Sequence, residues 1–126
     1  MPKSELLILI DESPQTGEYL RFRKLIGERG CRALDELPAR MHGGIARYFM
    51  KGIVPGRFLS AVLCNDLINS FGAADDENRH IIWNYCSFLY NHAHAGSWGS
   101  PKAVEEWNRL GGLDGIKASQ EVSDGS

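Results

Sequence analysis

The stretch FLSAVLCNDLINSF, residues 58–71, has the clearest helical pattern in the chain. At about 100° per residue, one broad face collects its large apolar side chains: Phe58, Leu59, Val62, Leu63, Leu67 and Phe71. The pattern predicts a single amphipathic helix that begins after Pro55-Gly56 and ends near Phe71. This helix should supply a large part of the hydrophobic core.

Asp66 interrupts that apolar face near its middle. An isolated buried carboxylate is costly, so we expect it to be paired or hydrogen-bonded. Arg47 and the loop around Trp98 are candidate partners, and the three residues would then form a structural polar tie. The alternative is a small enzyme or ligand-binding site around Asp66, with His42 and Trp98 nearby, in which burial raises the pKa of the carboxyl group.

The next helix is predicted to start at Asp75, which can cap it, and to end near His92. One face carries apolar side chains for the core: Ile81, Ile82, Tyr85, Phe88 and Leu89. Trp83 and Tyr90 lie on the opposite side, with Arg79 and Cys86 nearby. A helix that is apolar on two sides is either central to the fold or part of an interface. Because Trp, Tyr and Arg are enriched in binding hot spots, Trp83, Tyr90 and Arg79 are the candidate partner-binding residues.

Caps and stops predict three further helices: Thr16 to about Arg29, Asp35 to Gly52, and Ser100-Pro101 to Gly111-Gly112. Gly43-Gly44 inside the second of these indicates that another segment approaches it closely. The prediction is therefore an all-α bundle of about five short helices. The apolar run Leu6 to Ile10 fits either a first helical turn or one short N-terminal strand.

The sequence predicts one helical domain over residues 1–116, and the helical patterns are clearest in residues 37–110. Residues 117–126 are polar and are expected to form a flexible tail. No segment approaches the length of a membrane span, and no secretory signal is visible. With three cysteines and no CxxC spacing, we expect a reduced, cytoplasmic protein.

The 126 residues carry a net charge of −2, which by itself indicates no particular partner. Residues 1–60 hold ten Lys/Arg and seven Asp/Glu, and the remainder hold four and nine. A nucleic-acid-binding regulator could use the basic residues of the N-terminal third: Arg21, Arg23, Lys24, Arg29 and Arg32. Acidic residues interrupt this set and no helix-turn-helix or zinc-finger pattern accompanies it, so a solvated face is the competing interpretation.

No complete catalytic or metal-binding motif occurs in the sequence. His92 and His94 lie at a predicted helix end, but neither HExxH nor Cys/His ligand spacing is present. The cysteines fall in apolar helices, where thiols behave as small hydrophobes. We therefore expect no metal, no cofactor and no catalytic residues.

Part of the chain resembles a family of small uncharacterised helical proteins encoded by phages and prophages. The resemblance covers residues 37–110. The residues that carry it follow the pattern GGIxRY, PGxFLxAVLxNDL and WGSP, with Leu37-Pro38, Met41 and Trp107 beside them. It implies no catalytic residues, but it does imply a context: a phage accessory protein in a bacterial host.

Taken together, these features predict a non-catalytic protein-binding module. Its partner would be a host or phage protein, and an inhibitor of a host defence complex such as a CRISPR effector is the expected role. Homodimerisation through the same aromatic surface is a further expectation.

Overall fold

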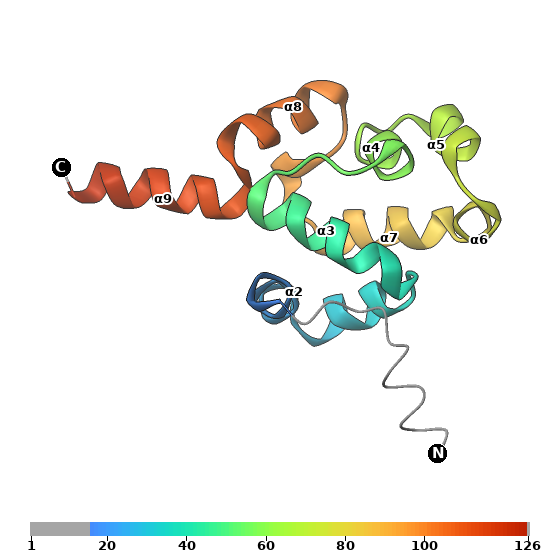
Figure 1. Ribbon diagram of the computed structural model, residues 1–126, viewed down its shortest axis with the longest axis horizontal. Coiled ribbons are helices and arrows are strands. Elements are labelled where there is room, and N and C mark those ends of the chain that lie inside the picture. Colours follow the sequence, from blue (N-terminus) through green and yellow to red (C-terminus); the bar gives the residue numbers. More distant parts are fainter. Residues whose placement is uncertain (1–15, 126) are drawn as a thin grey trace, which may run out of the picture.

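The computed structural model describes residues 16–125 and is all-α (Figure 1). This confirms the predicted fold class, but the predicted number of about five helices was too low. The described residues form eight α-helices and one 3-10 turn: α2 Gly17–Asp35, α3 Ala39–Lys51, α4 Arg57–Leu63, α5 Leu67–Ala73, α6 Asp76–His80, α7 Ile82–His92, η1 Ala95–Ser97, α8 Pro101–Leu110 and α9 Gly112–Gly125. The apolar run Leu6 to Ile10 lies outside the described residues.

Helix α3 runs through the middle of the molecule, with α2 on one side and α4 and α8 on the other (Figure 1). Helix α7 packs against α2, and α9 packs against α3 and α8 and then extends away from the body. Their buried faces meet in a core rich in aromatic rings: Phe22, Tyr48, Phe49, Phe58, Tyr85, Phe88 and Trp107. This core fixes which side of each helix remains at the surface.

Three predicted helix starts are confirmed by side-chain caps. Thr16 Oγ accepts from the backbone N–H of Tyr19 at 3.1 Å, and Asp75 Oδ1 accepts from that of Asn78 at 2.8 Å. Ser100 Oγ accepts from Ala103 at 3.0 Å, with Pro101 in the first turn of α8. In each helix the cap satisfies one backbone donor that the first turn leaves without a partner.

The predicted continuous helix from Phe58 to Phe71 is wrong, because α4 ends at Leu63 and α5 begins at Leu67. Asn65 adopts φ +61°, while its N–H donates to Val62 O and that of Asp66 donates to Ala61 O. These two bonds, with a left-handed residue between them, are a Schellman motif, a common helix ending. Asp66 then caps α5 by accepting from the N–H of Asn69 at 3.2 Å. The Asn-Asp pair thus ends one helix and starts the next.

Two other boundaries differ from the prediction. The break in α2 falls at Gly27, whose φ of +75° and ψ of −176° suit only glycine, and not at Gly30, which lies inside the helix. Asp35 does not cap α3. Its carboxylate pairs with Arg23 at 2.8 Å, and Pro38 occupies the N-cap position of α3.

The helix predicted from Asp75 to His92 is divided as well, because Ile81 leaves helical geometry between α6 and α7. At the other end of the chain, the expected tail from residue 117 is helical as far as Gly125. The first turns of α9, which precede residue 117, are held to the body. Leu113 and Ile116 pack against the core, and Asp114 pairs with Arg21 of α2 and Lys51 of α3, both at 3.0 Å.

Asp114 should make part of the stability depend on pH in the acid range. Hydrogen bonds from Arg21, and then from Lys51, lower its pKa from 3.8 to about 2. Since the folded-state pKa is depressed, the contribution of the Asp114 carboxylate to the free energy of unfolding is complete above about pH 4. It is lost as the pH falls through 2. Arg21 is half-exposed, so solvent screening should keep the contribution near 1 kcal/mol.

In urea unfolding between pH 4 and pH 2, Asp114→Asn should therefore lose less stability on acidification than the wild type does. Arg21→Met, which removes the main cause of the pKa shift, should weaken the same dependence. A wild-type acid dependence in Asp114→Asn would contradict this assignment.

Candidate functional site: the outer face of helix α7

Helix α7 has one buried face and one exposed aromatic face, so of the two interpretations that its sequence left open, central burial does not hold. Ile82, Tyr85, Phe88 and Leu89 are buried in the core. Trp83 and Tyr90 point the other way and are 74% and 80% exposed. A contiguous group of exposed apolar side chains, unlike a single one, is typical of an interaction surface.

The two aromatics border an open hollow between α7, the α4–α5 junction and the loop after η1. Its rim consists of Asn65, Trp83, Cys86, Tyr90 and Trp98, and Val62 and Leu89 contribute to its floor. We call this the aromatic hollow. Hydrogen bonds between residues far apart in sequence hold its walls in place: the backbone N–H of Gly99 donates to Leu63 O at 2.7 Å, and the side-chain hydroxyl of Tyr48 donates to Ser97 O at 2.6 Å.

A second exposed apolar group lies on α5, directly after the Asn65 rim. Because α5 is a separate helix, Leu67, Ile68 and Phe71 are not in the core but are 60%, 78% and 43% exposed. The sequence placed Leu67 and Phe71 on a buried face, so this surface was missed. The signal that could have revealed it is the Asn65-Asp66 pair, since both residue types favour helix ends.

Arg79, the third predicted partner-binding residue, is separated from the other two. It lies on α6, across the break at Ile81, and does not line the aromatic hollow. Its guanidinium is occupied by Asp76 at 3.0 Å and by the carbonyl of Ala74 at 3.4 Å. The structure therefore brings together Trp83 and Tyr90, with Asn65 and Trp98 in the place of Arg79.

The expected polar tie between Asp66, Arg47 and Trp98 is not formed. Both Asp66 oxygens accept from Asn69, at 3.2 and 2.6 Å, and the side chain is half-exposed at the start of α5. Arg47 lies exposed on α3. Trp98 packs on the core, and its indole N–H is buried without an acceptor among the described residues. The carboxylate avoids burial because the helix breaks where the continuous helix would have buried it.

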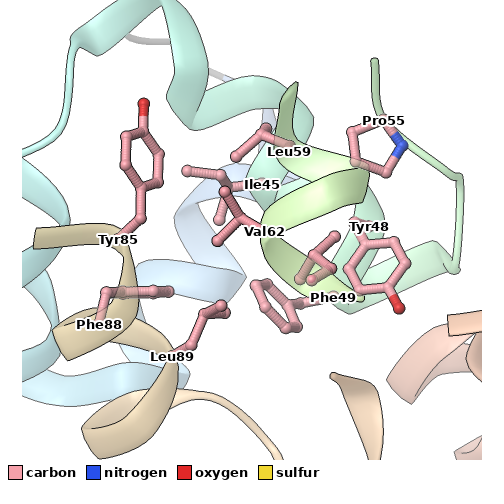
Figure 2. Close-up of a pocket in the computed structure, with 10 residues that line it drawn as sticks. Ile45, Tyr48, Phe49, Pro55, Leu59, Val62, Tyr85, Phe88 and Leu89 are labelled. Carbon is pink, nitrogen blue, oxygen red and sulfur yellow. The ribbon is translucent and has the colours of Figure 1, made fainter. Parts of the chain in front are cut away.

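The apolar space inside the core is not a ligand site. It lies among α3, α4 and α7, lined by side chains such as Ile45, Phe49 and Leu59 (Figure 2). About 20 Å³ is open to the centre of a water-sized sphere, which is room for one water and for no organic ligand. The hydroxyls of Tyr48 and Tyr85 point away from this space and donate to Ser97 O and Asn78 Oδ1.

Among residues 16–121, the titratable groups of the core are held by burial or by hydrogen bonds to the fold. Burial raises the pKa of the Tyr48 and Tyr85 phenols and, together with Asp66, that of the Cys64 thiol, so each is held in its neutral form. His42 is buried with both ring nitrogens bonded, to Tyr19 Oη at 3.0 Å and to Leu37 O at 2.9 Å. Since a carbonyl only accepts, Nε2 donates to Leu37 O, and Nδ1 shares the second bond with the Tyr19 hydroxyl. This geometry describes a structural histidine.

His92 and His94 are not grouped with further ligand side chains in the part of the chain that the structure describes. Within residues 16–125, no three His, Cys, Asp or Glu side chains converge as ligands would. His94 instead accepts from the N–H of Gly96 and packs its ring against Trp107.

The basic residues of α2 are largely neutralised by neighbouring carboxylates. Arg21 pairs with Asp114, Arg23 with Asp35 and Arg32 with Glu28. Lys24 and Arg29 are exposed, but two cations are few for a surface that must release counterions from a phosphate backbone. The geometry therefore favours a solvated face over a nucleic-acid interface.

Comparison with known proteins leaves the function to be argued from this surface. No family model matches the chain, and no curated protein or solved structure matches it. In the part of the chain that the structure describes, no helix has the length and apolar character needed to cross a membrane.

Proposed function

We propose that this chain is a non-catalytic protein-binding module whose contact surface is the outer face of α7 with the aromatic hollow. The observation that carries the proposal is the exposure of Trp83 and Tyr90, at 74% and 80%, on a helix whose other side is fully packed. Leu67 and Ile68 of α5, which follow Asn65 of the hollow in the chain, are exposed as well. Trp and Tyr in such positions are the residue types that contribute most to protein–protein affinity.

The partner we propose is a protein of a bacterial host or of a phage. The resemblance of residues 37–110 to small phage proteins supports this context, and the proposed place of action is the bacterial cytoplasm. Within it, the expected role is to occupy and block a host defence complex, such as a CRISPR effector. Blocking of a complex by contact through the exposed face of α7 requires no catalytic group in this chain.

Capture of partners from host lysate tests the proposal through single substitutions. Trp83→Ala and Tyr90→Ala should each weaken retention of the partner at least tenfold, which corresponds to about 1.4 kcal/mol. Neither should change the unfolding midpoint, since both side chains are exposed. Leu25→Ala is the matched control: Leu25 is also an exposed apolar residue on a helix, 60% exposed, but it lies outside the aromatic hollow.

Equal retention by wild type, Trp83→Ala and Tyr90→Ala would reject the proposed surface. Light scattering at high concentration provides a second measurement. If two copies associate through this face, the mass should fall from dimer to monomer in the Trp83→Ala variant. A dimer that persists in that variant would place the self-contact elsewhere.

A further inference from the structure

An apolar trough lies between helices α2 and α9, and it shares no lining residue with the aromatic hollow. It consists of two adjoining hollows that have Leu25 and Leu113 in common. Their volumes are about 250 and 340 Å³, against about 20 Å³ for the space in the core. Leu25 is 60% exposed, and Ile26, Leu113 and Ile116 are only partly buried. Among the described residues, this α2–α9 trough is therefore an apolar surface that is still open to water.

The charge of the α2–α9 trough differs between its two ends. At the end that Arg21 lines, Asp114 is already paired with Arg21 and Lys51. Lys117 lines the same end and makes no ion pair within residues 16–121, while Glu18 acts on Arg21 but does not line the trough. The other end contains neither a carboxylate nor a Lys or Arg side chain. A matching occupant is an apolar segment with acidic residues at one end only.

The chain itself carries such a segment shortly before α2. Residues 6–10 are five consecutive Leu and Ile side chains, and Asp11 and Glu12 follow them directly. This segment lies outside the described residues, which begin at Thr16. Its five apolar side chains and the walls of the trough would both gain free energy if they were removed from water together.

The connection is long enough for the apolar run to reach the trough. Leu25 lies nine residues after Thr16, which is about 13.5 Å along the axis of α2. Ile10 lies six residues before Thr16, and six residues can span about 20 Å. The run can therefore turn back along α2 and lie beside Leu25.

The direction of the chain agrees with the charge of the trough. A segment that turns back along α2 passes Arg21 before it reaches Ile26, because Arg21 is nearer to the start of the helix. Asp11 and Glu12 would then remain at the end that carries Lys117, and the apolar run would continue into the uncharged end. The opposite direction would place the two carboxylates at the apolar end, where no cation compensates them.

We propose that residues 6–10 of the same chain occupy the α2–α9 trough, with Asp11 and Glu12 at its Lys117 end. The docked segment ties the beginning of the chain to α9, in addition to the pairs that Asp114 already makes. The inference goes beyond the proposed function, because it concerns a different surface. Partner capture that depends on Trp83 and Tyr90 can succeed or fail independently of it.

Methyl NMR of the full chain, labelled at Ile and Leu, tests the contact directly. The methyl groups of Ile8 should show NOEs to those of Leu25, Leu113 and Ile116. The absence of any NOE between residues 6–10 and the trough would overturn the inference. An isotope-filtered spectrum of mixed labelled and unlabelled chains reports only contacts between copies and should show none of these NOEs. NOEs that pass the filter would mean that two copies exchange the segment, which overturns docking within one chain.

Two matched substitutions test the apolar contact. Ile8→Asp should abolish the NOEs, shift the methyl signals of Leu113 and lower the midpoint of urea unfolding. Ser4→Asp adds the same charge to the same segment, but outside the apolar run, and should change none of these. Far-UV circular dichroism of Ile8→Asp should remain that of the wild type, because residues 16–125 keep their helices. Equal behaviour of the two variants would overturn the inference.

Charge exchange tests the orientation of the docked segment. Lys117→Glu should weaken the NOEs of Ile8, since it places a carboxylate beside Asp11 and Glu12. The triple variant Lys117→Glu, Asp11→Lys and Glu12→Lys should recover them, because the attraction is restored with the signs reversed. NOEs that are unaffected by Lys117→Glu, or that the triple variant does not recover, would overturn the proposed orientation.

Discussion

Replacement of Trp107 by alanine is expected to lower the free energy of unfolding by about 3–5 kcal/mol. This is a large share of the total free energy of unfolding of a domain of this size. Trp107 is 2% exposed and fills the junction between α8 and α3. Its indole N–H donates to Tyr48 O at 2.8 Å, and its ring packs against His94. The alanine variant loses both the apolar burial and the bond that holds α8 to α3.

Trp107→Phe separates these two contributions. It keeps most of the ring but removes the donor, so we expect a loss of about 1–2 kcal/mol. The lower end of the usual range applies because Tyr48 O also accepts from the N–H of Gly52 at 2.8 Å. Urea unfolding followed by far-UV circular dichroism gives the free energies for all variants.

Trp98→Phe is the matched control for the hydrogen bond. The Trp98 N–H is buried without an acceptor among the described residues, so its removal relieves an unsatisfied donor and should cost less than Trp107→Phe. Equal losses in the two phenylalanine variants would show that the bond to Tyr48 contributes nothing beyond packing.

The sequence predicted helix starts better than helix breaks. Thr16, Asp75 and Ser100 were recognisable because a cap is a local event between residues three apart. The break at Asn65-Asp66 was missed because the apolar residues on either side continue at helical angles, and periodicity alone cannot detect a change of axis. Only the type of the two residues at the junction carried that information.

The candidate site was predictable in one half and not in the other. The exposure of Trp83 and Tyr90 follows from their angular position opposite the buried stripe of α7, which is local information. The opposite wall of the aromatic hollow depends on the hydrogen bond from Gly99 to Leu63, which joins residues 36 positions apart. It also depends on the change of direction between α4 and α5. Such long-range contacts leave no periodic signal in a single sequence.

Glycines show the same distinction. Gly43-Gly44 predicted a close approach of another segment, yet a Cβ at Gly44 would meet only ordinary contacts at 3.9 and 4.0 Å. The close approach lies between Gly52 and Gly112, which the sequence identified only as helix stops. A Cβ on Gly112 would lie 2.6 Å from the backbone N of Gly52 and 2.7 Å from that of Lys51.

Gly112→Ala is therefore expected to cost more than about 3 kcal/mol, because strain and overlap add. Gly112 has φ +65°, and the atoms that its Cβ would meet belong to the backbone of α3 and cannot rotate away. Relief requires α9 to separate from α3, which would also weaken the pairing of Asp114 with Lys51. The measurement is again urea unfolding.

Two neighbouring comparisons show which part of this loss comes from the overlap. Gly111 has a similar φ of +80°, but its nearest contact would be 3.4 Å, so Gly111→Ala should lose only about 1–2 kcal/mol from left-handed strain. Gly72→Ala, in open space on α5, should gain about 0.5–1 kcal/mol because alanine favours the helix. If Gly112→Ala loses no more than Gly111→Ala, the direct contact of the two backbones is not what positions α9.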